Sequence, residues 1–128
     1  MKKKPRSLTV KKMSPAVYEL RRKVIALVYE AKALVPTLPR LTVRITYNHE
    51  SILAMAKISR DYIEVSDQAI NRSDLDLRTI VFHEIIHAVF GVRHDEKCPL
   101  MKAHHTPLPK DRVHSLFLKY AGKARVAS

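Results

Sequence analysis

The chain of 128 residues is poor in the residue types that support disulfide-rich or loop-rich folds. It contains one cysteine, Cys98, so no disulfide can form within the chain, which favours a reducing compartment. Two glycines and the absence of tryptophan argue against a loop-rich or all-β fold. Apolar residues make up 46% of the chain, so a single domain with one packed core is expected.

Long apolar runs are also missing. The basic start of the chain resembles the first part of a signal peptide, but Lys11 and Lys12 interrupt the apolar segment that should come next. No run approaches the length that a membrane span requires. We therefore expect no contact with a membrane and a cytoplasmic location.

Acidic residues are scarce relative to basic ones. The chain has 12 Asp and Glu against 24 Lys and Arg, and six of its first twelve residues are basic. Such a charge attracts nucleic acid or an acidic protein surface, although it also serves solubility. We expect a flexible basic arm over residues 1–13, able to contact nucleic acid, and a single, monomeric domain over residues 14–128.

Capping residues and apolar spacing predict the helices. Ser14 followed by a proline is typical of a helix start, and apolar residues then recur at helical spacing from 16 to about 35. Ser73, with Asp76 three residues later as in a capping box, predicts an apolar helix over 74–90. Gly91 stands where a helix commonly ends. A last helix is predicted over 109–120.

Strands are predicted between the first two helices. Residues 41–47 alternate with period two, and weaker candidates cover 51–58 and 61–65, with a turn near residues 59–60. The order of elements predicts an α+β domain with helices packed on one face of a small mixed sheet.

The most informative segment is His83-Glu84-Ile85-Ile86-His87, which fits the pattern H-E-x-x-H. On a helix, His83 and His87 lie one turn apart on the same face, where two imidazoles can hold one Zn²⁺. Glu84 then stands beside the metal as a candidate general base. Burying two histidines and a glutamate in so apolar a helix would be unfavourable without a partner such as a metal ion.

A catalytic zinc site needs a third protein ligand, and His94 is the nearest candidate beyond Gly91. Other groups that can ligate zinc occur in the same segment, and they stay open as alternatives: Asp95, Glu96, Cys98, His104 and His105. His114 lies on the predicted last helix. Cys98 also fits a buried, inert thiol, and His94 an exposed loop histidine.

Residues 83–94, HEIIHAVFGVRH, and the downstream Met101 resemble the zincin metallopeptidases, most closely the metzincins. The resemblance covers about residues 60–122 and implies a zincin-like fold with a small sheet. It also implies His83, His87 and His94 as zinc ligands, Glu84 as the general base and Met101 in a turn beneath the metal. Plain core packing is the other interpretation of Met101.

The spacing departs from that family at one point. Gly91 comes four residues after His87 rather than three, and His94 seven after rather than six. Proteases that act on DNA–protein crosslinks share the glycine spacing, and their His-Asp continuation is similar to His94-Asp95. An extra helical residue rotates the subsequent chain by roughly 100°, so the turn must compensate or another group must replace His94.

These residues predict a zinc-dependent metalloendopeptidase that hydrolyses peptide or protein substrates. A strand before the site helix, 54–58 or 61–65, would bind the substrate in extended form by edge pairing. One alternative is a zinc-dependent endoribonuclease, although the ribosomal-RNA maturation enzymes with similar histidine spacing have Gly where this chain has Glu84. A second is a non-catalytic zinc domain that binds nucleic acid, with Cys98 among four ligands.

Overall fold

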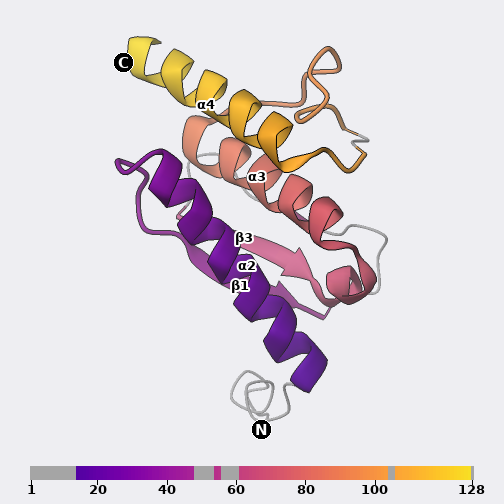
Figure 1. Cartoon of the computed structure of the whole chain (residues 1–128). Helices are drawn as coiled ribbons and strands as arrows, with labels where there is room; N and C mark the ends of the chain where they lie inside the picture. The colour runs from indigo at the N-terminus through magenta and orange to yellow at the C-terminus, as the bar shows by residue number, and fades with distance from the viewer. Residues whose placement is uncertain (1–13, 48–53, 56–60, 104–105, 128) are drawn as a thin grey trace, which may run out of the picture.

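A computed structural model describes residues 14–47, 54–55, 61–103 and 106–127 of the chain (Figure 1). The predicted basic arm over 1–13 and the turn near 59–60 lie outside these residues. In chain order the elements are α2 (Pro15–Leu34), β1 (Thr42–Thr46), β2 (Ala54–Met55), β3 (Tyr62–Ser66), the 3-10 helix η1 (Asp67–Asn71), α3 (Asp74–Phe90) and α4 (Lys110–Ala127).

The helix starts agree with the predicted caps. The Ser14 hydroxyl accepts the Val17 amide at 3.2 Å, and the Ser73 hydroxyl accepts the Asp76 amide at 3.1 Å. The Asp76 carboxylate accepts a hydrogen bond from Arg72 at 3.1 Å and so forms an ion pair, while the Asp76 amide bonds to the Ser73 hydroxyl. Both helices therefore begin where local sequence places them.

One predicted helix end was wrong, one predicted strand is described only in part, and one short helix was not predicted. The last helix continues to Ala127 instead of ending near 120. Within the described residues, the strand predicted over 51–58 is present as Ala54–Met55. The short helix η1 was not predicted; it begins where the Ser66 hydroxyl accepts the Gln68 amide at 3.1 Å.

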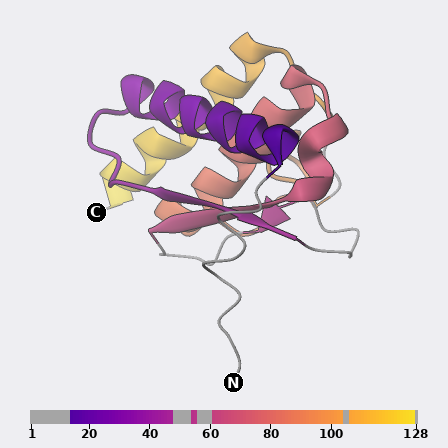
Figure 2. The same cartoon turned by 90° about the horizontal axis from the view of Figure 1, so that it is seen from below.

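The described strands form a mixed sheet in the order β1-β3-β2. β1 pairs with β3 in parallel, and β2 pairs with β3 antiparallel. Figure 2 shows α2, α3 and α4 on the same side of this sheet, so the predicted α+β arrangement with helices on one face is confirmed. Because β3 lies between the other two strands, it offers no free edge for a further strand.

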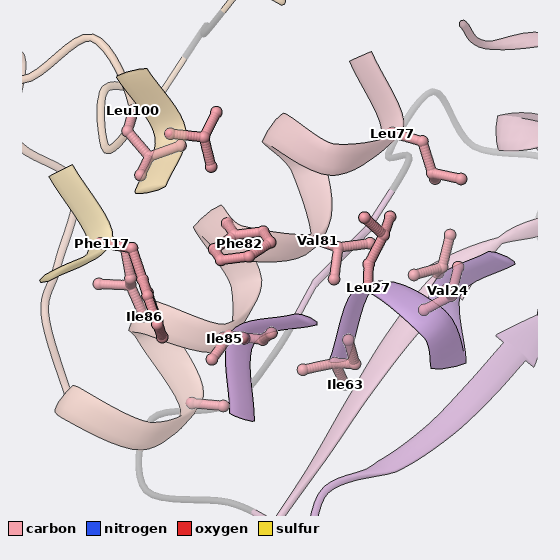
Figure 3. Close-up of a cluster of buried hydrophobic side chains, with 14 of the residues drawn as sticks. Val24, Leu27, Ile63, Leu77, Val81, Phe82, Ile85, Ile86, Leu100 and Phe117 are labelled. Carbon is pink, nitrogen blue, oxygen red and sulfur yellow. The ribbon is translucent and has the colours of Figure 1, made fainter. Parts of the chain in front are cut away.

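α3 lies between α2 and α4 and also packs against the sheet (Figures 1 and 3). Phe82 packs on Phe117 of α4 with ring centroids 5.0 Å apart, edge to face. On its other side, Val81 and Ile85 belong to the buried cluster that includes Leu27 of α2. A helix enclosed on several sides must be apolar almost all round, which explains why two histidines and a glutamate stand out in it.

None of the described helices combines the length and the apolar character that crossing a membrane requires.

Candidate metal centre

Three histidine side chains meet at the C-terminal end of α3. His83 and His87 come from successive turns of the helix, and His94 comes from the segment after it. One ring nitrogen of each lies within 4.8 Å of the corresponding nitrogens of the other two. In the part of the chain that the structure describes, this is the one group of three or more histidine, cysteine or acidic side chains so close together.

Backbone carbonyls fix the orientation of two of the rings. His83 Nδ1 lies 2.7 Å from the Leu100 carbonyl oxygen, and His87 Nδ1 lies 2.5 Å from the Val92 carbonyl oxygen. A carbonyl oxygen can only accept, so each Nδ1 must carry the proton and donate it. In the neutral rings, both Nε2 atoms are then left as lone-pair acceptors.

The two Nε2 atoms face each other at 3.1 Å. Two lone pairs at that distance repel unless a proton or a metal cation lies between them. Burial lowers the pKa of His87 from its ordinary 6.5, against an opposing effect of the Val92 carbonyl, and so favours the neutral ring. The pair of facing nitrogens has the geometry to accept a shared proton or a metal cation.

Glu84 lies beside this cluster and is only 6% exposed. Its Oε2 is 3.9 Å from His83 Nε2. Burial raises the pKa of Glu84 to about 8, because the surroundings disfavour the charged carboxylate. A cation at the histidine cluster would counteract that effect and return the carboxyl to its ionised form.

The turn after α3 compensates for the extra residue in the spacing. Gly91 adopts a left-handed conformation with φ 67°, and its amide donates to the His87 carbonyl at 3.2 Å. The chain reverses there and brings the His94 ring centroid within 4.9 Å of that of His87 and 5.3 Å of that of His83. The longer spacing thus still allows His94 to join the pair.

The carboxylates next to His94 in the chain are engaged elsewhere. The Asp95 carboxylate accepts the Lys97 amide at 3.0 Å, and the Glu96 carboxylate accepts the Ala103 amide at 2.9 Å. Both hydrogen bonds shape the loop itself. Among the described residues, neither carboxylate belongs to the histidine cluster.

Cys98 and Met101 are both buried in the hydrophobic core. Cys98 also lies against α4: burial and a hydrogen bond with Cys98 raise the pKa of Tyr120. Cys98 is not part of the histidine cluster, which agrees with its interpretation as a buried thiol. Met101 is fully enclosed, and its carbonyl accepts the Asp95 amide at 2.9 Å, so it anchors the loop whether or not it also supports a metal.

The remaining histidines stand apart from the site or outside the described residues. His114, on α4, lies 2.6 Å from a carboxylate oxygen of Glu30 on α2. His104 and His105, also predicted as possible ligands, lie outside the described residues.

Sequence reasoning missed the two carbonyl groups of Val92 and Leu100, which orient the histidines. They act through backbone atoms that every residue carries, so no side-chain pattern could identify them. The position of Gly91 was the one available signal, since a chain reversal there returns the subsequent backbone towards α3.

The chain was compared with family models, with curated proteins and with solved structures, and none of them matches it.

Proposed function

We propose that the chain is a zinc-dependent metallopeptidase, with His83, His87 and His94 as the ligands of one zinc ion. The observation that carries the proposal is the pair of Nε2 atoms 3.1 Å apart, each left as an acceptor by a carbonyl at its Nδ1. A tetrahedral zinc with Zn–N bonds of about 2.0 Å needs nitrogens roughly 3.3 Å apart. His83 and His87 therefore fit that ion with little movement, and His94, whose ring nitrogen lies within 4.8 Å of theirs, would complete the set by moving closer.

Three ligands favour a catalytic site over a structural one. Structural zinc sites are closed by four protein ligands, whereas catalytic sites keep a position for water or substrate. Within the described ranges, the structure offers three histidines and keeps Cys98 outside the cluster. This supports the peptidase over the non-catalytic zinc domain.

The chemistry proposed for the site is hydrolysis of a peptide bond. A bound zinc ion would acidify a water molecule and polarise the substrate carbonyl. Glu84 would accept a proton from the attacking water and return it to the leaving amine as the carbon–nitrogen bond breaks. Its burial keeps the carboxyl away from competing solvent, and its 3.9 Å distance to His83 Nε2 supports this role.

β2 is the strand best placed to hold the substrate. It lies at the edge of the described sheet and packs against α3, which carries the histidines. An extended peptide could add to its outer edge by main-chain hydrogen bonds. The alternative strand, 61–65, largely coincides with β3, which pairs on both sides and is not available for this role.

The decisive experiment is cleavage of a diverse peptide mixture by zinc-loaded protein, read by mass spectrometry. Glu84→Gln should keep one zinc per chain and lose the cuts. Glu64→Gln, the same chemical change on β3, should retain them. Cleavage that persists in Glu84→Gln would refute the mechanism.

Further measurements distinguish the peptidase from the endoribonuclease and from the non-catalytic zinc domain. If the parent protein holds one zinc and cuts no peptide, structured RNA is the next substrate, because the charge of +12 suits it. Cleavage of RNA that depends on Glu84 would replace the peptidase proposal with the endoribonuclease. Thiolate charge-transfer bands in Co²⁺-substituted protein would instead show Cys98 as a ligand and support the structural site.

A further inference from the structure

A second candidate binding site lies between α2 and β1, and none of the three histidines lines it. A cavity of about 480 Å³ opens there. Its α2 wall is a single helical stripe that includes Ile25, Val28 and Tyr29. Its other wall is the chain that leads into β1, ending at Val43. Figure 2 shows α2 lying over this edge of the sheet, and β2, the strand assigned to the peptidase substrate, lies at the opposite edge.

The groove has an apolar floor and a basic rim. Half-buried or buried aliphatic side chains form the floor, among them Ile25, Val28 and Val43. Arg21 and Arg40 stand on the rim, and none of the eleven lining residues is acidic. Tyr29 adds an aromatic ring that is 70% exposed.

At the edge of β1 beside the groove, alternate residues direct their backbone N–H and C=O groups away from β3. The Thr42 amide donates to the Asp61 carbonyl at 2.9 Å, so Thr42 directs its polar groups towards β3. In a parallel pair this direction alternates along the strand. Val43 and Ile45 therefore direct their N–H and C=O groups to the other edge, where the described sheet has no further strand.

The dimensions of the two walls match. The stripe from Arg21 to Lys32 extends about 16 Å at 1.5 Å per helical residue. The chain from Leu38 to Val43 extends about 17 Å at 3.3 Å per residue. A groove of that length holds about five residues of extended chain.

We propose that this groove binds an extended acidic peptide segment, which adds to β1 as an edge strand. Its backbone would pair with Val43 and Ile45, alternate aliphatic side chains would enter the apolar floor, and its carboxylates would face Arg21 and Arg40. A nucleic acid would use the charge but neither the strand edge nor the aliphatic floor, so the peptide is favoured. The proposal does not depend on the peptidase assignment.

The test is a fluorescence polarisation titration of the full chain with a labelled heptapeptide, Glu-Ile-Glu-Val-Glu-Ile-Glu. The Glu84→Gln background prevents cleavage of the probe and lies outside the groove. Arg21→Glu with Arg40→Glu should weaken binding by about tenfold or more. Lys110→Glu with Lys119→Glu, an equal change of charge on α4, should have a much smaller effect.

A second measurement locates the peptide. In ¹⁵N-labelled protein, the probe should shift the amide signals of Val43 and Ile45 more than those of β3. Equal weakening by both double variants, shifts confined to other elements, or no binding would overturn the proposal. Binding of an oligothymidylate that depends on Arg21 and Arg40, with no binding of the peptide, would also overturn it and assign the groove to nucleic acid.

Discussion

At the scale of single residues, the position of one proton on each imidazole determines what the histidine cluster can bind. Carbonyl oxygens of Leu100 and Val92 hold the protons of His83 and His87 on Nδ1. Both Nε2 atoms are therefore oriented towards each other, as the proposed metal site requires. The third histidine differs, because His94 is exposed and comes from the segment after the turn at Gly91.

The first prediction concerns His94. Its replacement by alanine should weaken zinc binding by at least about a hundredfold, because it leaves two ligands instead of three. Asp95→Ala and Glu96→Ala, the neighbouring alternatives, should retain zinc affinity within a few-fold. Competition with a chromophoric chelator measures all three variants. A loss of affinity in Glu96→Ala that matches the loss in His94→Ala would show that the third ligand is wrongly assigned.

The second prediction concerns Glu84 in metal-free protein. Its pKa of about 8 lies above its ordinary value of 4.5, so the folded state keeps a proton that the unfolded state releases. The stabilisation is complete below pH 4.5 and is lost as the pH rises to about 8, by up to about 1.4 kcal/mol per pH unit. Glu84→Gln should remove this dependence.

Urea denaturation in the presence of a chelator, at pH 5 to 8, measures the effect. The free energy of unfolding of Glu84→Gln minus that of the parent should increase with pH. Glu64→Gln should reproduce the parent curve. Parallel curves for the parent and Glu84→Gln would show that burial does not retain the proton.

At the scale of elements, the turn after α3 decides whether the site can form. Gly91 in its left-handed conformation allows the reversal that returns both the Val92 carbonyl and His94 to the helix. A residue with a side chain is disfavoured in that conformation. The site thus depends on a backbone conformation as much as on its ligands.

The third prediction uses the two glycines of the chain. Gly91→Ala should lower the free energy of unfolding by about 1 kcal/mol and also weaken zinc binding, because Val92 and His94 move. Gly122→Ala, within α4, should raise the free energy of unfolding by about 0.5–1 kcal/mol, since nothing lies within 4 Å of the added carbon. Thermal denaturation and zinc titration check both, and unchanged zinc affinity in Gly91→Ala would contradict the role of the turn.

The sequence was most informative where structure is local. Ser14, Ser73 and Gly91 mark helix ends by bonds or dihedral angles within a few residues, and those ends were predicted correctly. The strand order β1-β3-β2 could not be predicted, because it depends on contacts between distant residues. The end of α4 was misplaced because its last turns lack the apolar spacing that identified its start.

The candidate site, too, was predictable from the sequence only where it depends on local spacing. The H-E-x-x-H spacing placed His83, Glu84 and His87 together, and the glycine pointed to His94. Whether the turn would compensate for the extra residue depended on its backbone angles, which the residue types alone did not determine. The cysteine and carboxylate alternatives were equally close in sequence, and only the fold of the loop separates them from the cluster.

At the scale of the whole molecule, one carboxylate connects α2, α3 and α4. The carboxylate of Glu30, on α2, accepts two hydrogen bonds from Arg78 of α3, at 2.8 and 3.1 Å. It also lies 2.6 Å from the ring nitrogen Nε2 of His114 on α4. Partial burial alone would raise the pKa of Glu30, but the hydrogen bonds with Arg78 and His114 outweigh it and lower the pKa below 4.5. The layers above the sheet are therefore joined by an ion pair as well as by the core.

The fourth prediction rests on this connection. Glu30→Gln should lower the free energy of unfolding by about 1–3 kcal/mol, because it leaves the partly buried Arg78 without its counter-charge. Because the pKa of Glu30 is lowered, the stabilisation is present above pH 4.5 and is lost below it. Glu19→Gln, which disrupts an exposed ion pair with Arg22, should leave the melting temperature unchanged. Equal effects of the two variants would show that Glu30 does not join the helices.

The three histidines stand within eleven positions of one another along the chain, whereas Glu30 and His114 are 84 apart. Loop-closure entropy grows with the logarithm of that separation, so bringing the imidazoles together costs about 2 kcal/mol less than closing the contact between α2 and α4. We therefore expect the cluster to be retained more readily than that contact in a fluctuation that separates α4 from α2. A metal ion held there would stay with the chain while the rest of the core opens and closes around it.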